Sequence, residues 1–125
     1  MKQGVTLLMN VHGADWDILT SELYIKTYFT KLIRAVDLTP VPESFTARFF
    51  PSSDKVNYGV TAFMVLLESH IAIHTWPELR YARIELSSCK DFDWQKAVEI
   101  TQAFTGGIVR AKMVSWNNMD EEQRE

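Results

Sequence analysis

Residues 58–78 read Tyr-Gly-Val-Thr-Ala-Phe-Met-Val-Leu-Leu-Glu-Ser-His-Ile-Ala-Ile-His-Thr-Trp-Pro-Glu, and this stretch predicts two neighbouring strands. The segment 58–67 is almost wholly apolar, which is typical of a buried strand. The segment 69–75 alternates instead, and its two predicted faces carry Ile71 and Ile73 against His70, Ala72 and His74. Because the connection between the two segments is short, we expect them to pair antiparallel and to begin a sheet.

The remaining strands are expected on both sides of this pair. Apolar or alternating patterns predict them at 5–12, 44–50, 81–88 and 108–115. A loop is expected at 51–55, where Pro51 is followed by Ser, Ser, Asp and Lys.

Two helices are expected. Apolar spacings of three and four predict the first over 20–36, with Thr20 or Ser21 as its cap. The second should begin at Asp91 or Asp93, run to about Phe104 and end at Gly106-Gly107. The acidic tail 120–125 should be frayed.

The predicted order is therefore β-α-β-β-β-β-α-β. It indicates an α+β fold, a two-layer sandwich in which an antiparallel sheet carries two helices on one face. The length of 125 residues fits a single domain, 1–125. The opposite sheet face would be bare unless a partner covers it, so we expect oligomerisation.

Composition narrows the function classes. Hydrophobic residues make up 46% of the chain and support a sizeable core, while a net charge of −3 argues against a nucleic-acid partner. A single cysteine excludes an internal disulfide and suits a cytoplasmic protein. No apolar run is long enough for a membrane span, and the start of the chain is typical of a first strand and not of a signal peptide. We expect no metal site, and we interpret His12 and His70 as structural.

One run of residues points to a chemistry. It is Glu68-Ser69-His70-Ile71-Ala72-Ile73-His74-Thr75-Trp76-Pro77-Glu78, followed by the only cysteine, Cys89. Taken singly, these residues have ordinary structural roles, because a lone cysteine is usually a small buried hydrophobe. Their joint spacing resembles the self-processing site of the prokaryotic, pyruvoyl-dependent S-adenosylmethionine decarboxylase proenzymes. Tyr58-Gly59-Val60-Thr61-Ala62 and Tyr81-Ala82 fit the pattern of the same family.

The resemblance implies that the chain makes its own cofactor. It would cut itself between Glu68 and Ser69 into residues 1–68 and 69–125, leaving a covalent pyruvoyl group at residue 69. His74 would be the proton acceptor in processing, and Thr61 would stand where the family has a serine. Because residues 69 and 74 fall on opposite faces of an extended strand, a bend or bulge between them is needed if His74 is to reach Ser69.

The resemblance also implies the reaction. The pyruvoyl ketone would condense with the substrate amine and draw electrons from the carboxylate bond, so that S-adenosylmethionine is decarboxylated for spermidine synthesis. Cys89 would donate the proton that replaces the carboxylate. Phe49 and Trp76 would contact adenine, and Glu78 would meet the ribose hydroxyls or the sulfonium charge. The family also implies a homodimer with active sites near its interface.

The chain departs from the family pattern at several places. Arg80 and Lys90 stand where the family has glycines, an insertion of about six residues precedes Tyr58, and Gly4-Val5-Thr6-Leu7 replaces the family's early Gly-x-His-Leu. Two alternatives therefore stay open. One is a pyruvoyl decarboxylase of arginine or ornithine, and the other is a non-catalytic dimeric homologue that only binds a ligand or partner.

Overall fold

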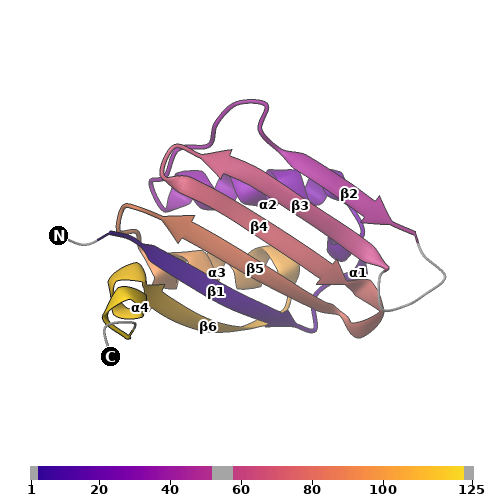
Figure 1. Ribbon diagram of the computed structural model, residues 1–125. Helices are drawn as coiled ribbons and strands as arrows, with labels where there is room; N and C mark the ends of the chain where they lie inside the picture. The colour runs from indigo at the N-terminus through magenta and orange to yellow at the C-terminus, as the bar shows by residue number, and fades with distance from the viewer. Residues whose placement is uncertain (1–2, 52–57, 123–125) are drawn as a thin grey trace.

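One antiparallel sheet of six strands organises the computed structural model, which describes residues 3–51 and 58–122 (Figure 1). The strands are β1 (Val5–His12), β2 (Thr46–Phe50), β3 (Gly59–Leu66), β4 (Ser69–Trp76), β5 (Tyr81–Ser88) and β6 (Ile108–Ser115). Their order across the sheet is β2-β3-β4-β5-β1-β6. The predicted strands and their antiparallel pairing are confirmed, and β4 lies in the interior of the sheet between β3 and β5.

Helices α2 (Glu22–Ala35) and α3 (Trp94–Thr105) lie across one face of this sheet (Figure 1). Ser21 caps α2 by accepting a hydrogen bond from the Tyr24 amide, and Asp93 caps α3 by accepting one from the Lys96 amide. Gly106 ends α3 with a φ of 74°, a conformation that glycine adopts without strain. The predicted two-layer α+β sandwich is therefore confirmed.

Three short helices of the described residues were not predicted. The first is α1 (Trp16–Leu19), which places the buried Leu19 under the sheet. The second is the one-turn 3₁₀ helix η1 (Pro77–Leu79), which follows β4. The third is α4 (Trp116–Glu122), so the expectation of a frayed tail from residue 120 was wrong at its start. Trp116 ties this segment to β1, because its Nε1 donates to Thr6 Oγ1 at 2.8 Å. The predicted loop at 51–55 lies, from Ser52 onward, outside the described residues.

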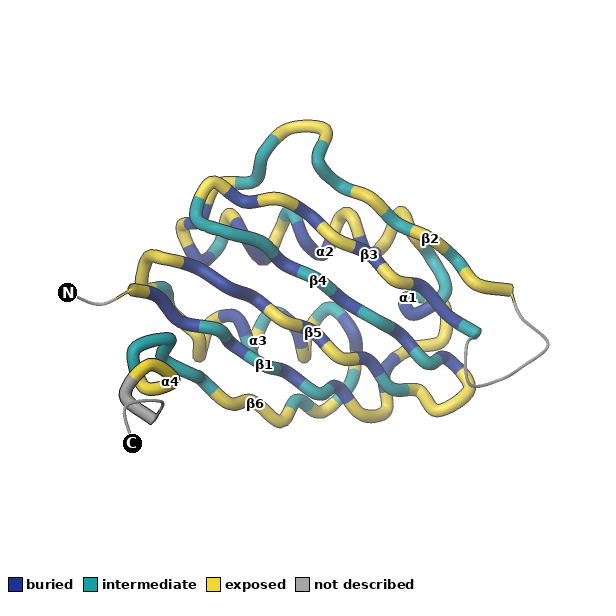
Figure 2. The backbone as a smooth tube through the Cα atoms, viewed as in Figure 1, coloured by how far each residue is buried: buried dark blue, intermediate teal, exposed yellow. Residues whose placement is uncertain are grey.

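The core lies between the sheet and the helices. Buried residues alternate with more exposed ones along the strands (Figure 2). The largest fully buried side chains of the core include Tyr28 and Phe29 of α2, which pack over the apolar face of the strands. Tyr28 Oη and Thr101 Oγ1 lie 2.6 Å apart and join α2 to α3, and burial raises the pKa of Tyr28. Apolar burial of this kind is the main source of stability for a domain of this size.

The start of α4 meets the other face of the sheet at Thr6 through Trp116, and α2 and α3 leave that face uncovered (Figure 1). We call it the open face. Cross-strand pairing builds one row across it from Arg48, Thr61, His74, Arg83, Asn10 and Arg110. Phe63, Val65 and Ile108 expose large apolar side chains on the same face. The bare sheet face that the pattern predicted is thus present. In the described residues no helix has the length and apolarity needed to cross a membrane.

Thr75 links three elements from inside the core, which makes it a sharp test of the fold. Its Oγ1 accepts a hydrogen bond from the Val60 amide at 2.9 Å and donates one to the Leu19 carbonyl at 2.7 Å. Thr75→Val keeps the volume but leaves both backbone groups buried without a partner. We expect it to lower the free energy of unfolding by about 2–4 kcal/mol, measured by urea denaturation.

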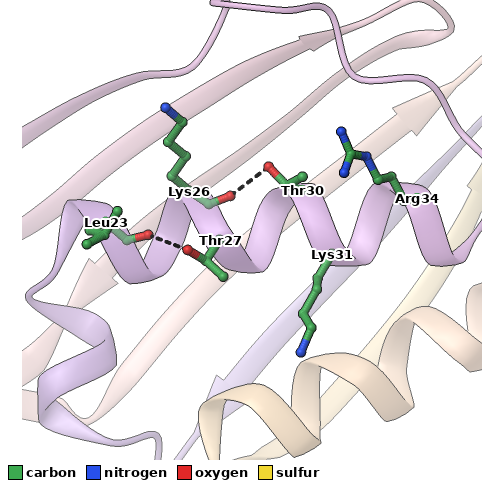
Figure 3. A pocket seen from close by; sticks show the side chains of 6 residues that line it. All are labelled: Leu23, Lys26, Thr27, Thr30, Lys31 and Arg34. Carbon is green, nitrogen blue, oxygen red and sulfur yellow. Dashed lines mark hydrogen bonds between the residues drawn. The ribbon is translucent and has the colours of Figure 1, made fainter.

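Thr27→Val is the matched control, since Thr27 is an exposed threonine of α2 whose hydroxyl donates to the Leu23 carbonyl (Figure 3). It should change the free energy of unfolding by less than about 0.5 kcal/mol. Equal effects of the two substitutions would contradict the linking role of Thr75.

Candidate active site

The motif residues occupy the two ends of β4. Glu68, Ser69, His70 and Cys89 lie where β4 begins, and we call this group the serine end. Thr61, His74, Trp76 and Glu78 lie toward its other terminus, and we call this group the histidine end. Because a strand rises about 3.3 Å per residue, Ser69 and His74 are about 16 Å apart along β4.

No bend or bulge brings these ends together. The pairing of β4 with β5 runs residue by residue from Ser69↔Ser88 to Trp76↔Tyr81, and its pairing with β3 is equally regular. The bend that His74 would need to reach Ser69 is therefore absent, and within one chain the two residues stay apart. Strand alternation also places His74 on the open face, whereas Ser69 falls on the helix-facing side with the buried Ile71.

The serine end presents a peptide carbonyl to a hydrogen-bond donor. The Cys89 amide donates to the Glu68 carbonyl oxygen at 3.0 Å. The Ser69 hydroxyl, on the other side of the same peptide bond, lies 3.1 Å from His70 Nδ1. On one side of the Glu68–Ser69 peptide bond, the Ser69 hydroxyl contacts a nitrogen that can accept its proton. On the other side, the Glu68 carbonyl accepts a hydrogen bond from an amide. Acyl transfer needs both of these contacts.

The Glu68 side chain is held as well. The Thr39 amide donates to Oε1 at 2.9 Å, and Thr39 Oγ1 donates to Oε2 at 3.1 Å. The Leu67 amide returns a hydrogen bond to the Thr39 carbonyl at 2.9 Å. Three hydrogen bonds therefore fix the turn between β3 and β4, and the carbonyl of Glu68 keeps its direction toward Cys89.

Cys89 is exposed and follows directly after β5. Ser88 braces this position, because its Oγ donates to the Lys90 carbonyl at 2.6 Å and accepts from the Lys90 amide at 2.9 Å. Lys90 Nζ donates to the Asp37 carbonyl at 3.0 Å, just beyond the C-terminus of α2, where a cation is favourable. The charge of Lys90 is thus directed to α2.

At the histidine end, aromatic side chains form a cluster on the open face. Thr61 Oγ1 and His74 Nδ1 lie 2.5 Å apart, and the His74 ring meets Trp76 edge-on with centroids 4.2 Å apart. Tyr81 extends the cluster at 5.3 Å from Trp76. Burial lowers the pKa of His74, which favours the neutral imidazole that can accept a proton.

Two proposed substrate residues lie apart from this cluster. Phe49 pairs with the buried Val60, so it belongs to the helix-facing side, where its ring meets Tyr58 at 5.3 Å. Glu78 is exposed in η1. Their contacts with a substrate stay predictions. Among the described residues, no group of three or more His, Cys, Asp or Glu side chains is placed to hold a metal ion.

Sequence reasoning missed His70 and Thr39. Strand alternation places His70 on the opposite face from Ser69, and this hid their contact at the first position of β4. Thr39 belongs to no motif, because its role arises from a contact with Glu68, which lies 29 positions away in the chain. Only the adjacency of His70 to Ser69 could have drawn notice.

Neither of two surface hollows found in the described residues joins the two ends. One of about 460 Å³ lies on the outer side of α2 and contains no motif residue (Figure 3). It is lined by Leu23, Lys26, Thr27, Thr30, Lys31 and Arg34. Another of about 460 Å³ adjoins the serine end, where Asp37, Lys90 and Asp91 contribute to its lining.

Arg80 explains why a glycine is usual at its position. It closes η1 with φ 51° and ψ 39°, the left-handed region that costs a residue with a Cβ about 1–2 kcal/mol. Its side chain is exposed. We expect Arg80→Gly to raise the free energy of unfolding by about 0.5–1 kcal/mol in urea denaturation, because relief of strain exceeds the added entropy of the unfolded chain.

Arg80→Ala separates strain from charge, since it removes the guanidinium but keeps the Cβ. It should leave stability close to that of the unaltered chain. A gain from Arg80→Ala equal to that from Arg80→Gly would show that charge, not backbone strain, limits stability at this turn.

Comparisons with known proteins agree with the motif. The family model described as S-adenosylmethionine decarboxylase matches residues 5–115. The S-adenosylmethionine decarboxylase proenzyme of Clostridium botulinum strain Langeland is 36% identical over 96 residues, which cover 76% of this chain and 77% of that protein. The proenzyme of Hydrogenobaculum is 31% identical over 88 residues, covering 70% and 60%.

The fold has a solved counterpart. The crystal structure of the adenosylmethionine decarboxylase from Aquifex aeolicus superposes with a TM-score of 0.75 and 22% sequence identity. The superposition covers 91% of this chain and 90% of that one. At this identity the likeness supports the arrangement of strands and helices.

Proposed function

The chain belongs to the S-adenosylmethionine decarboxylase family, and from this premise we propose that it cuts itself at Glu68-Ser69 and decarboxylates S-adenosylmethionine. The enzyme is a pyruvoyl-dependent carboxy-lyase, and its product serves spermidine synthesis. One observation carries the proposal: the Glu68 carbonyl accepts a hydrogen bond from the Cys89 amide, and the Ser69 hydroxyl lies on the other side of the same peptide bond. We place the enzyme in the cytoplasm, where its single thiol stays reduced.

The first step replaces an amide by an ester. Ser69 Oγ attacks the Glu68 carbonyl carbon, the C–N bond breaks, and Glu68 becomes esterified to the serine side chain. Negative charge develops on the Glu68 oxygen during the attack. The Cys89 amide already donates to that oxygen, so it stabilises the charge with little reorganisation.

The second step creates the cofactor. Removal of the Ser69 α-proton expels Glu68 as a carboxylate and leaves a dehydroalanine, whose hydrolysis releases ammonia. His74 is the proposed acceptor of this proton, because its imidazole contacts Thr61 and burial lowers the pKa of His74, which favours the neutral form. The pyruvoyl group formed at residue 69 supplies an electron-withdrawing ketone that makes loss of carbon dioxide feasible.

Cys89 is placed to serve the later protonation. It follows Ser88, which pairs directly with Ser69 across β4 and β5. A substrate held at residue 69 would lie at the same end of the sheet as this thiol, which is one residue beyond the pair. We therefore assign Cys89 the delivery of a proton to that carbon.

A single chain leaves this site incomplete. His74 and Thr61 are about 16 Å from Ser69 along β4, so we propose a homodimer whose open faces pack together. In that dimer His74 of the partner subunit completes the serine end. Support comes from Phe63, Val65 and Ile108, which expose apolar surface on the open face.

Substrate recognition at one serine end is assigned to the histidine end of the partner subunit. Trp76 stands in the aromatic cluster beside His74 and can stack on adenine. Glu78 supplies a carboxylate for the ribose hydroxyls or the sulfonium charge. Because Lys90 is bound to the Asp37 carbonyl and Arg80 is exposed, no observation favours arginine or ornithine over S-adenosylmethionine.

Self-cleavage is tested by intact mass spectrometry of the purified chain. We expect two pieces, residues 1–68 and 69–125, with the second lighter by one ammonia than a free seryl peptide because of its pyruvoyl terminus. Ser69→Ala should remain a single uncut chain. Persistence of the unaltered chain at its full mass would refute the proposed processing.

The role of Cys89 is tested after processing. Cys89→Ala keeps the backbone amide that faces Glu68, so it should cleave normally, while carbon dioxide release from S-adenosylmethionine should fall about 100-fold or more. Cys89→Ser retains a weaker proton donor, so its rate of carbon dioxide release should lie between those of the unaltered chain and Cys89→Ala. Unchanged turnover in Cys89→Ala would remove the thiol from the mechanism. Release of carbon dioxide from arginine or ornithine alone would replace the proposed substrate.

A further inference from the structure

The nucleophile has a hydrogen-bond partner in the histidine that follows it. His70 Nδ1 lies 3.1 Å from Ser69 Oγ, so an unprotonated Nδ1 accepts the hydrogen bond that the hydroxyl donates. Both residues are half-buried, which limits competition from water. A nucleophile and a base in hydrogen-bond contact are the starting arrangement of many acyl transfers.

The surroundings hold the His70 ring in place. Phe63 of β3 stacks on it with centroids 5.3 Å apart and planes inclined by 23°. Its cross-strand neighbours are Val65 on β3 and Ser87 on β5. The Ser87 hydroxyl is engaged with Thr6 Oγ1 at 2.8 Å, so Ser69 is the hydrogen-bond partner that the structure gives to the imidazole.

The electrophile is held on the other side of the same bond. Thr39 fixes the Glu68 carboxylate, and the Cys89 amide fixes the Glu68 carbonyl. All groups that the amide-to-ester step requires therefore stand within one chain at the serine end. His74, which lies at the far end of β4, is absent from this set.

We propose that His70 is the catalytic base of the first step, a deduction that rests on the proposed cleavage at Glu68-Ser69. His70 takes the proton from Ser69 Oγ as the Oγ–C bond to Glu68 forms. The imidazole then returns that proton to the Ser69 nitrogen as the C–N bond breaks. The step is an isomerisation, so it consumes no other reactant. His74 acts only afterwards, on the α-proton of the ester.

The two histidines then have separable defects. Without His74, the chain should stop at the ester, which hydroxylamine cleaves to give a hydroxamate at Glu68. Without His70, the chain should stop at the amide, which resists hydroxylamine. The test is cell-free synthesis of the full chain, followed by intact mass spectrometry with and without hydroxylamine.

His70→Gln keeps a hydrogen-bonding side chain but cannot carry the proton. We expect ester formation to slow by at least about 100-fold and the chain to remain hydroxylamine-resistant. The double variant His70→Gln/His74→Ala should also stay at the amide. Accumulation of ester in either His70→Gln variant, or cleavage of His70→Gln at the unaltered rate, would overturn the proposal.

Two further variants guard against a folding defect. His12→Gln removes another imidazole of the open face, whose ring centroid lies 5.1 Å from that of Tyr81, and the variant should cleave at the unaltered rate. Phe63→Leu keeps His70 but loosens its ring, so it should slow ester formation measurably; an unaltered rate would contradict the proposal. If the unaltered chain itself never cleaves, the proposed function fails. If the unaltered chain and His70→Gln cleave alike, only the role of His70 fails.

Discussion

The unbroken pairing of β4 between β3 and β5 is the constraint on which the site depends. Every residue from Ser69 to Trp76 has a fixed partner on β5, and the alternation of faces is never interrupted. This regularity buries Ile71 and Ile73 against the helices and leaves His74 and Trp76 on the open face. It also holds Ser69 and His74 about 16 Å apart, because a paired strand cannot shorten without a bulge. A division of the chemistry between two ends of one strand follows from this geometry.

The serine end owes its order to contacts between distant segments. Thr39 reaches it from the connection after α2, and Cys89 reaches it from the end of β5. Lys90 anchors the segment after β5 to Asp37, so a residue that departs from the family pattern has a local structural role. Arg80 instead takes a left-handed backbone conformation, and its side chain is exposed. The two departures therefore differ in kind: one adds a tether beside the reacting bond, and the other adds backbone strain at an exposed turn.

Much of the fold could be predicted from the sequence, because strand alternation and helix caps are local signals. The helix ends were indicated by residues that cap helices: Ser21 and Asp93 accept hydrogen bonds from backbone amides, and Gly106 adopts a positive φ. The helix α4 could not be predicted in this way, because its start is tied to β1 by Trp116. At the site, the spacing of Ser69, His74 and Cys89 in the sequence indicated which side chains carry the proposed chemistry. It did not indicate that Ser69 and His74 lie at opposite ends of β4. The contact between Ser69 and His70 could not be predicted, because alternation assigns the two residues to opposite faces although Ser69 Oγ and His70 Nδ1 lie 3.1 Å apart.

Complementation between two inactive chains measures whether one site is built from two copies. Ser69→Ala and His74→Ala chains, distinguished by mass, are produced separately and together, and the pyruvoyl-bearing fragment 69–125 is sought by mass spectrometry. We expect that neither variant alone yields this fragment. Together they should yield it from the His74→Ala chain, which keeps its own Ser69 and receives His74 of the partner subunit. Absence of the fragment from mixed dimers, or its appearance from the His74→Ala chain alone, would contradict a site divided between two copies.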